Sequence, residues 1–589
     1  MQSIGRYTVT GMEQQLVRLS ELLNEVYREH SAEEIDYMWS QLLQILNQHS
    51  DKRDNYAELS ELWNSSSAVL ITYADGVYKS GEPTLKTLKD LIDLHLNDFA
   101  SVIHVLPFLC STSDGGFAVS DFEKLETRFG EWDHLKALSK NHILMADLVL
   151  NHVSSSHPWV QQFIQSKEPG SKYILSPSSS ENWEDVTRPR NTSLFTNLST
   201  TKGKKDVWTT FGPDQIDINW KEPYVLIEFL RLIIRYIDSG IKWIRLDAVG
   251  FIWKEPGTTC LHRNEVHKIV KALRIQINEL INSSVLITET NVPEKENVSY
   301  LSSGDEAHLA YNFPLPPLLL ESLITNKADL LNNWLSSWPE LPKNTGFLNF
   351  TASHDGVGLR ALEGLMDQKR IRELLIACEK RGGLISHRRM SNGEDQPYEL
   401  NISWWSAMAD KGRDTSLFQF ERFLLSQLFV MALKGVPAFY LQALMASEND
   451  LTTFAKSGQR RDLNREKFEA NTLRIKLEDE KSHPSRNLTS LKKAMQVRRK
   501  LNAFHPNQPM KCLSKSRSDL VIISRGEGNE TIWALHNMTN SKLCFSLSEG
   551  LNVNGESTVS WDDCLNDYKR HQNRIDLHPY SVHWLMKSN

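Results

Sequence analysis

The chain has 589 residues, of which 40% are hydrophobic and 24% charged, and its formal net charge is −6. One hydrophobic core does not serve a chain of this length, so we expect one large domain with smaller ones attached. The mildly acidic balance offers no electrostatic attraction to nucleic acid or to an anionic membrane surface, and we expect neither partner.

The sequence favours a cytoplasmic protein. Its six cysteines are scattered without a Cys-x-x-Cys pair, which argues against a zinc or redox motif and favours free thiols in a reducing compartment. Glu13 and Glu21 interrupt any apolar run of the kind that marks a secretory signal. The apolar stretch 423–446 is broken by Gln427 and Pro437 well short of a membrane span.

Residues 1–66 have the pattern of an N-terminal helical extension. Apolar residues recur at helical spacing between residues 16 and 26, and a second helix is expected over residues 33–46. No chemistry is visible in this segment, which we interpret as a helical layer added to the main domain.

From residue 68 onward, short apolar strands alternate with amphipathic helical stretches. Strands are expected at residues 69–73, 102–107, 143–150, 242–247, 285–289, 347–352 and 436–441. Repeated βα units imply a parallel sheet with right-handed crossovers. Their number and the long loops between them favour an α/β fold of the (β/α)8 type, a TIM barrel. No Gly-x-Gly-x-x-Gly follows the first strand, which counts against a dinucleotide-binding fold.

Two polar inserts interrupt this pattern, and a different pattern follows it. Long loops in a compact barrel are usually functional, and barrel chemistry lies at the C-terminal ends of strands, so both inserts should overhang one mouth. Short alternating strands near the C-terminus predict a small β domain. We divide the chain into the extension (1–66), a catalytic barrel (67–153 and 214–504), a B domain (154–213), a B′ region (356–405) and a C-terminal β domain (505–589).

Charged side chains close several of the expected strands. Arg245 and Asp247 are two residues apart and therefore share one face of a strand. A structural ion pair at the strand end would explain this pair equally well. Other strand ends carry further polar residues, however: Asp147 with Asn151-His152, then Glu289, and then His354-Asp355. Their convergence on one barrel mouth predicts a site.

Segments 146–152, 244–249, 287–291 and 352–356 resemble the four conserved regions of the α-amylase family, family 13 of the glycoside hydrolases. Their order and spacing match as well. Further segments resemble the sucrose phosphorylase subfamily, namely 70–75, 104–108, 214–218, 254–257 and 461–465. The likeness extends over roughly residues 68 to 585. It implies an enzyme, a glycosyltransferase acting as a disaccharide phosphorylase.

The resemblance implies a division of labour among three carboxyl groups. Asp247 would be the nucleophile that forms a covalent glucosyl ester, Glu289 the general acid and then base, and Asp355 the stabiliser of the oxocarbenium-like charge. Arg245 would keep Asp247 ionised, because an adjacent cation lowers the pKa of a carboxyl group. Glu289 instead needs surroundings that raise its pKa.

Around a single glucosyl unit, the resemblance assigns Asp114, Phe117, His152, Gln215, Arg245, His354 and Arg461. The transferred group could pass to water or to phosphate, and phosphate needs cationic donors near the mouth. The inserts offer Arg188, Arg190, Arg388 and Arg389 as candidates. For each of them, a solvated loop charge is the alternative.

The acceptor side departs from the sucrose phosphorylases. Phe251 stands where they carry Tyr, Asn291 where they carry His, and Tyr398-Glu399 where they carry Tyr-Gln. These departures resemble the glucosylglycerate phosphorylases of the same subfamily, and a carboxylate-bearing acceptor would suit the arginines near residue 388. Sucrose or glucosylglycerol phosphorylase, an α-glucosidase-type hydrolase and a non-catalytic sugar-binding barrel stay as alternatives.

We expect a glucoside and inorganic phosphate as the partners, no cofactor, no metal, and a monomer or homodimer. Asn151 resembles a calcium ligand of amylases. Phosphorylases of this subfamily do not need calcium.

Overall fold

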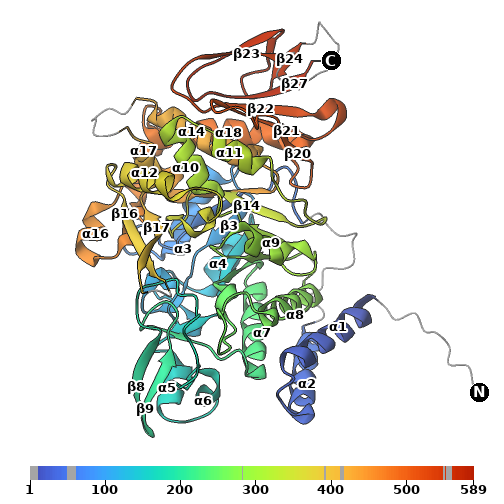
Figure 1. Ribbon diagram of the computed structural model, residues 1–589, viewed down its shortest axis with the longest axis vertical. Coiled ribbons are helices and arrows are strands. Elements are labelled where there is room, and N and C mark those ends of the chain that lie inside the picture. The colour runs from blue at the N-terminus through green and yellow to red at the C-terminus, as the bar shows by residue number, and fades with distance from the viewer. Residues whose placement is uncertain are drawn as a thin grey trace, which may run out of the picture.

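The computed structural model describes residues 11–49, 62–178, 180–281, 283–390, 393–410, 417–547, 551 and 560–588. Within this part of the chain, eight parallel strands close into a barrel (Figure 1). In chain order they are β1 (Val69–Thr72), β3 (Val102–Val105), β6 (Ile143–Val149), β11 (Ile241–Asp247), β12 (Val285–Thr288), β13 (Leu309–Tyr311), β14 (Gly346–Phe350) and β18 (Val436–Tyr440). Each strand pairs with the next, and β18 pairs with β1, which confirms the predicted TIM barrel.

The sixth strand, β13, was not predicted. It has only three residues, Leu309–Tyr311, and so gives no apolar run that stands out from its surroundings. The other strands were predicted because both faces of a barrel strand are covered, so that nearly every residue is apolar. Several end sooner than expected; β12, for example, ends at Thr288, which leaves Glu289 just beyond the strand.

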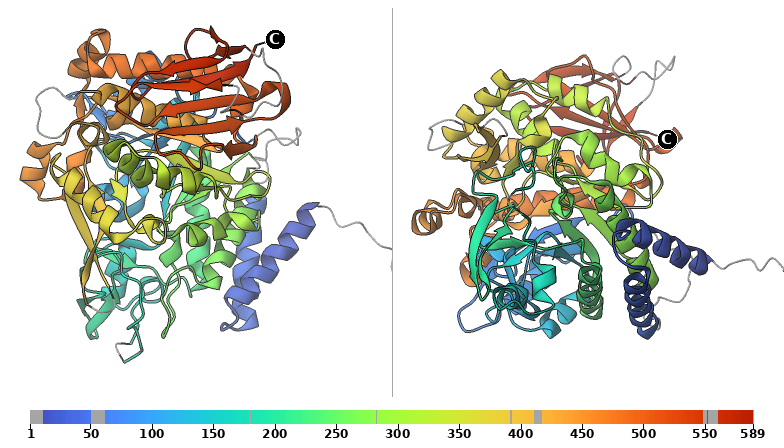
Figure 2. Two further views of the ribbon diagram at one scale, coloured as in Figure 1. Left: turned by 45° about the horizontal axis from the view of Figure 1, so that its top comes forward. Right: turned by 60° about the horizontal axis from the view of Figure 1, so that its bottom comes forward.

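Helices follow the strands and cover the outside of the barrel (Figure 2). Those around the barrel include α3 (Thr84–Leu91), α4 (Trp132–Ser139), α7 (Pro223–Asp238), α8 (Asn264–Leu280), α9 (Glu294–Ser302), α10 (Leu315–Thr325), α14 (Gln419–Ala432) and α18 (His483–Lys500). In α7, one stripe of apolar residues is fully buried, including Val225, Phe229 and Ile233. The spacing of these residues fixes the face that α7 turns to the strands.

Both helices expected in the N-terminal extension are present: α1 (Gly11–Val26) and α2 (Ala32–Gln48). A capping box formed by Ser31 and Glu34 begins α2. Helix α1 lies along α8 and α2 along α7, so the pair forms an extra layer on one side of the barrel (Figure 1). Residues 1–10 and 50–61 of the extension lie outside the described residues.

The two inserts meet each other. The insert after β6 contains α5 (Pro158–Ile164) and the hairpin of β8 (Phe195–Thr200) and β9 (Gly203–Trp208). The insert after β14 contains α12 (Gln368–Glu379) and a sheet of β15 (Val357–Gly358), β17 (Asp395–Asn401) and β16 (Leu384–Arg389). The backbone N–H of Arg389 donates to the carbonyl of Arg190 at 3.4 Å. The expected overhang of both inserts at one place is thus present.

An antiparallel sheet ends the chain, and it lies at the far end of the molecule from the β8–β9 hairpin (Figure 1). Its strands run in the order β20 (Met510–Cys512), β21 (Leu520–Arg525), β22 (Ile532–Asn537), β27 (Val582–Lys587), β24 (Trp561–Asp563) and β25 (Lys569–His571). It has an apolar core of its own. We propose to keep the division into domains made from the sequence. Among the described helices, none is both long and apolar enough to cross a bilayer.

Candidate active site

The register of neighbouring strands gathers the charges at the barrel mouth. Strand β11 pairs with β6 so that Arg245 lies opposite Asp147. Nη1 of Arg245 donates to the carboxylate of Asp147 and, at 2.7 Å, to Oδ1 of Asp247. The Arg245–Asp247 pair therefore does more than cap a strand: Asp247 lines a pocket, and Arg245 holds Asp247 without lining the pocket itself.

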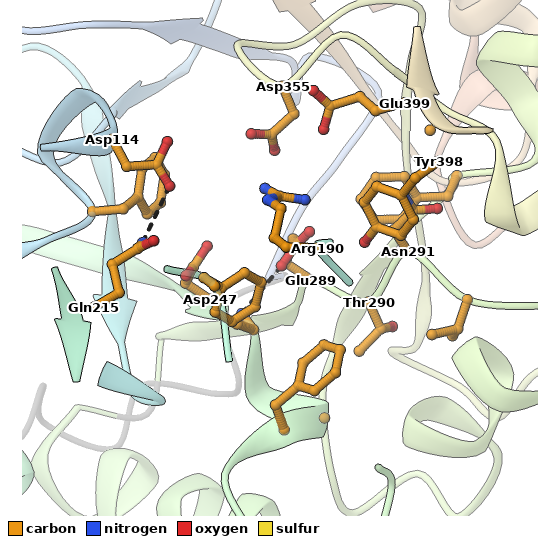
Figure 3. Close-up of a pocket in the computed structure, with 18 of the residues that line it drawn as sticks. Asp114, Arg190, Gln215, Asp247, Glu289, Thr290, Asn291, Asp355, Tyr398 and Glu399 are labelled. Carbon is orange, nitrogen blue, oxygen red and sulfur yellow. Dashed lines mark hydrogen bonds between the residues drawn. The ribbon is translucent and has the colours of Figure 1, made fainter. Parts of the chain in front are cut away.

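The pocket brings most of the predicted site residues together (Figure 3). The predicted residues that line it are Asp114, Phe117, His152, Arg190, Gln215, Asp247, Phe251, Glu289, Asn291, Asp355, Tyr398, Glu399 and Arg461. In Figure 3, Asp114 and Gln215 lie on one side of the three acidic groups, and Asn291 and Tyr398 lie on the opposite side. One end of the pocket therefore suits a glucosyl ring and the other an acceptor.

Glu289 follows β12 and faces the end of β11. The backbone N–H of Ala248 donates to Oε2 of Glu289 at 3.1 Å, and Nη2 of Arg245 lies 3.8 Å from Oε1. Ala248 has φ = 50°, a left-handed conformation that costs a non-glycine residue free energy and is found at functional sites. This turn directly after Asp247 aims an amide at the second carboxyl group.

Burial raises the pKa of both Asp247 and Glu289, while the Arg245 guanidinium opposes the shift in each. The expectation of a raised pKa for Glu289 is confirmed. Arg245 lowers the pKa of Asp247 as expected, but the pKa still lies above its ordinary value, because desolvation, together with the carboxylates of Glu289 and Asp147, outweighs one guanidinium. Asp247 accepts the direct guanidinium hydrogen bond and Glu289 only an amide one, so a single shared charge rests on Asp247 and the proton on Glu289.

Asp355, the third carboxyl group, is held ionised. Oδ1 of Asp355 lies 2.7 Å from Nη1 of Arg461. Burial works to raise the pKa of Asp355, but the Arg461 guanidinium, with Arg245 further away, holds it well below its usual range. Asp355 thus differs from Asp247 and Glu289, whose pKa values burial raises.

The closed end of the pocket is a hydrogen-bonded wall. Nε2 of Gln215 donates to Oδ2 of Asp114 at 3.2 Å and lies 3.0 Å from Nε2 of His152. Phe117 stacks on His354 with ring centroids 5.1 Å apart. His354 does not line the pocket itself; within the described residues its ring nitrogens have no hydrogen-bond partner. His354 packs against Phe117, and its Nε2 lies 3.3 Å from Oδ1 of Asp355. Its hydrogen bond to a sugar hydroxyl stays a prediction.

Aromatic rings and one arginine form the open end. Phe251 packs edge-on against Phe211, with centroids 5.5 Å apart. The Arg190 guanidinium lies over Phe211 at 5.7 Å and over Tyr398 at 5.6 Å. In the part of the chain that the structure describes, Arg190 has no carboxylate partner, and its hydrogen bond is to the adjacent carbonyl of Pro189. An anion at the mouth would find this guanidinium available.

Asn291 faces the same open end. Its Oδ1 is buried without a hydrogen-bond partner among the described residues. The adjacent Gly358 leaves room for this side chain, because a Cβ at that position would lie 2.6 Å from the Asn291 amide nitrogen. An unpartnered buried amide oxygen is costly, which indicates a hydroxyl or water donor at this point.

The remaining arginines do not reach the pocket. Arg388 is buried and donates to Glu363 at 2.5 Å, and Arg389 pairs with Asp395 at 2.8 Å. Arg389 and Asp395 lie directly opposite each other in the β16–β17 ladder, which accounts for their pairing. Arg188 also lies outside the pocket lining. The expectation that arginines near residue 388 meet the acceptor is therefore corrected.

Glu399 lines the pocket next to Arg461, which also contacts Asp355. It binds the Arg461 guanidinium through two contacts, at 2.7 Å and 3.1 Å, and Asn401 donates to it at 2.7 Å. This bidentate geometry fixes Arg461, which in turn holds Asp355. Glu399 thus lines the pocket as predicted, and its contact with the acceptor stays a prediction.

Several pocket residues were not predicted. They are Phe211, Ala248, Gly250, Leu261, His262, Thr290, Val292, Phe313, Gly356 and Gly358. Most of them are neighbours of predicted residues, and a wider window around each motif would have included them. His262 carried no motif; its Nδ1 lies 2.7 Å from the Tyr300 hydroxyl, a contact between distant segments.

Comparisons with known proteins agree with this geometry. The family model for the catalytic domain of α-amylase matches residues 95–375. A glucosylglycerate phosphorylase of Allomeiothermus silvanus is 38% identical over 479 residues, which cover 81% of this chain and 86% of the relative. A glucosylglycerate phosphorylase of Escherichia coli is 33% identical, covering 89% and 92%. A sucrose phosphorylase of Bifidobacterium adolescentis is 26% identical, covering 85% and 96%.

Among solved structures, the sucrose 6F-phosphate phosphorylase of Thermoanaerobacter thermosaccharolyticum has the same fold. The TM-score is 0.71 at 23% identity, and the match covers 87% of this chain and 98% of that one. Fold, site and family model define the class of protein: a catalytic barrel of the α-amylase family. Within that family, the chain belongs to the glycoside phosphorylases that include the glucosylglycerate and sucrose phosphorylases.

Proposed function

We propose that the protein is a retaining glucosylglycerate phosphorylase, which converts 2-O-α-glucosylglycerate and phosphate into α-glucose 1-phosphate and glycerate. One observation carries this proposal: a three-carboxylate pocket sealed at its glucosyl end opens toward a single guanidinium, Arg190, that has no carboxylate partner within the described residues. The printed names of the relatives at 38% and 33% identity support the choice of glycerate.

The first half-reaction breaks the glucosidic bond. The Asp247 carboxylate attacks the anomeric carbon, and Glu289 gives its proton to the departing glycerate oxygen. The raised pKa of Glu289 keeps this proton available, and the ionised Asp355 offsets the positive charge that develops on the ring. The products are a glucosyl ester on Asp247 and free glycerate.

The second half-reaction transfers the glucosyl group to phosphate. A phosphate oxygen attacks the anomeric carbon, the ester bond to Asp247 breaks, and Glu289 takes back a proton from the phosphate. Two inversions restore the α configuration. Arg190, at the mouth, would hold the phosphate, because a guanidinium binds an oxyanion through paired hydrogen bonds.

The same guanidinium would hold the carboxylate of glycerate in the first half-reaction, since glycerate and phosphate leave and enter through the same end. The Asn291 amide, whose Oδ1 is buried without a partner in the described structure, would accept a hydrogen bond from a glycerate hydroxyl. Phe251 and Phe211 make part of the acceptor end apolar, which suits a small acceptor better than fructose.

A substrate panel tests the acceptor. The enzyme is incubated with phosphate and with glucosylglycerate, glucosylglycerol or sucrose at equal concentrations, and glucose 1-phosphate is quantified. We expect glucosylglycerate to have the highest kcat/KM, by about 10- to 100-fold, which corresponds to the loss of one charge-assisted contact. Comparable turnover of sucrose would remove the glycerate assignment, and free glucose as the sole product would remove the phosphorylase assignment.

We propose a cytoplasmic location from the state of the protein's cysteines. All six cysteines are free in the structure, as the sequence predicted. This state supports a reducing environment such as the cytoplasm.

A further inference from the structure

A buried lysine lies behind the acceptor end of the pocket. Residues 248–263 connect β11 to α8, and several residues of this loop line the pocket, among them Phe251 and His262. Lys254 lies between them in sequence, yet it lies outside the pocket lining and is only 5% exposed. The proposed reaction gives this lysine no role, and a buried ammonium needs a specific reason.

The Lys254 ammonium binds two polar residues near the glucosyl end, Asn151 and Asp217. Its Nζ donates to Oδ1 of Asn151 at 2.7 Å and lies 2.5 Å from Oδ2 of Asp217. Asn151 and Asp217 are completely buried. The indole of Trp208, in the insert after β6, lies 5.8 Å from the ammonium.

Both partners of Lys254 lie at strands that carry glucosyl contacts: Asn151 directly precedes β7, and Asp217 ends β10. Strand β7 (His152–Ser154) pairs with β10 (Gln215–Asp217), with Asp217 opposite His152. His152 and Gln215 both line the glucosyl end, and Gln215 also binds Asp114. Asp217 therefore lies in the same strand pair as His152 and Gln215, the residues that line the glucosyl end.

Asp217 also fixes the aromatic side of the mouth. The backbone N–H of Thr210 donates to Oδ1 of Asp217 at 3.0 Å, and the Thr210 hydroxyl donates to Oδ2 at 2.6 Å. The next residue, Phe211, packs on Phe251 and lies beneath Arg190. The loop after β11 is thus held at two points, by the ion pair at Lys254 and by the ring contact at Phe251.

We propose that Lys254 is a positioning residue. Its ammonium binds Asn151 and Asp217 and so links residues 248–263, the acceptor loop, to strands β7 and β10. This link fixes the position of the acceptor end of the pocket relative to the glucosyl end. The inference rests on the proposed transfer from Asp247 to an incoming phosphate. Without the link, water still reaches the glucosyl ester, whereas phosphate no longer finds Phe251, Phe211 and Arg190 in their places. Loss of Lys254 should therefore change the partition between phosphate and water.

Lys254→Met removes the ammonium and keeps the length of the side chain. The partition is measured as glucose 1-phosphate formed per free glucose formed, at fixed phosphate. We expect this ratio to fall at least tenfold in the variant, while kcat for hydrolysis stays within about threefold of the wild type. Because Lys254→Met leaves the Asp217 carboxylate buried and unpaired, the double variant Lys254→Met/Asp217→Asn provides a second test without that charge.

Lys467→Met is the matched control. Nζ of Lys467 lies 2.6 Å from the buried carboxylate of Asp75, away from the acceptor loop, so this variant also breaks a lysine–aspartate pair of similar distance. The Lys467 side chain is half-exposed, and Asp75 keeps Arg128 at 3.2 Å. We expect its partition to equal that of the wild type. A Lys254 variant, single or double, that is folded and has the wild-type partition would overturn the inference, as would an equal shift in Lys467→Met. A wild type that forms no glucose 1-phosphate would instead overturn the proposed function.

Discussion

At the scale of single residues, the site depends on an uneven distribution of one proton among neighbouring carboxyl groups. Asp247 and Glu289 are both buried, and burial raises the pKa of each. Arg245 contacts Asp247 directly at 2.7 Å and Glu289 only at 3.8 Å. The guanidinium therefore decides which group acts as nucleophile and which as acid, although it does not lower the pKa of the nucleophile below its usual range.

Removing the nucleophile should abolish turnover without unfolding the protein. Asp247→Asn is expected to lower kcat by about four orders of magnitude or more, because no covalent intermediate can form. The pKa of Asp247 is raised in the folded state, so the stability linked to this group is present at low pH and is lost as pH rises through the raised value. We therefore expect the Tm of Asp247→Asn at pH 8 to equal or exceed that of the wild type. Turnover above a tenth of the wild-type value would mean that another group is the nucleophile.

The pH profile should report Glu289. Its acid form is the active one, so kcat/KM should fall as pH rises through a pKa that burial has raised above the ordinary 4.5. Burial lowers the pKa of His152 to about 4 and that of His354 to about 3, so neither histidine should add an inflection between pH 6 and 8.

A donor with a different leaving group provides the control for this pH profile. α-Glucosyl fluoride needs no acid to leave, so with this donor Glu289→Gln should retain glucosylation, and neither the wild type nor the variant should show the alkaline limb. The measurement is fluoride release against pH in wild type and variant. An unchanged alkaline limb in Glu289→Gln would assign that limb to a different group.

At the scale of elements, the two inserts supply the acceptor end. The insert after β6 contributes Arg190 and Phe211, and β17 of the insert after β14 contributes Tyr398. Neither insert forms the acceptor end alone, because the Arg190 guanidinium contacts the ring of Phe211 from one insert and the ring of Tyr398 from the other. Selection of the acceptor is thus a property of their contact.

Arg190 should govern phosphate. Arg190→Ala is expected to raise the KM for phosphate by about 10- to 100-fold, in line with a charge-assisted contact of about 1.5–3 kcal/mol. The comparison variant is Arg388→Ala, since Arg388 pairs with Glu363 outside the pocket and should leave the KM for phosphate unchanged. Initial rates at varied phosphate measure both. The assignment of phosphate to Arg190 would be wrong if the two variants behaved alike.

Sequence reasoning located elements and strand-end charges well, because both leave local signals. Buried parallel strands are apolar runs, and Asp247 and Glu289 follow such runs directly. Strand β13 escaped because three residues make no run. Arg388 was misplaced for a different reason: its partner, Glu363, is distant in sequence, and only tertiary pairing reveals it. The Lys254–Asp217 pair could not be predicted on the same ground.

At the scale of the whole molecule, the N-terminal helices α1 and α2 are part of the barrel's outer layer. Leu19, Leu23 and Leu42 are almost completely buried where the helices meet α7 and α8. Lys268 of α8 also pairs with Glu25 of α1 at 2.7 Å. Because α8 follows the acceptor loop directly, the extension braces the element on which that loop ends (Figure 2).

Stability should therefore depend on the extension. Leu23→Ala is expected to destabilise the protein by about 2–5 kcal/mol, the range for a buried leucine truncated to alanine. Val17→Ala, on the same helix but 56% exposed, is the control and should change stability by less than about 0.5 kcal/mol. Denaturant unfolding of both variants decides the question. Equal effects would show that α1 does not pack on the barrel in solution as described.

The most direct test of the account follows the reaction of glucosylglycerate with and without phosphate by proton NMR. With phosphate, we predict that α-glucose 1-phosphate is the first sugar product to appear and that glycerate is released in equal amount. Without phosphate, release of glycerate should slow by at least about tenfold, because only water then resolves the glucosyl ester on Asp247. β-Glucose 1-phosphate as the first product would contradict retention. Release of glycerate and free glucose at the same rate with and without phosphate would contradict a phosphorylase.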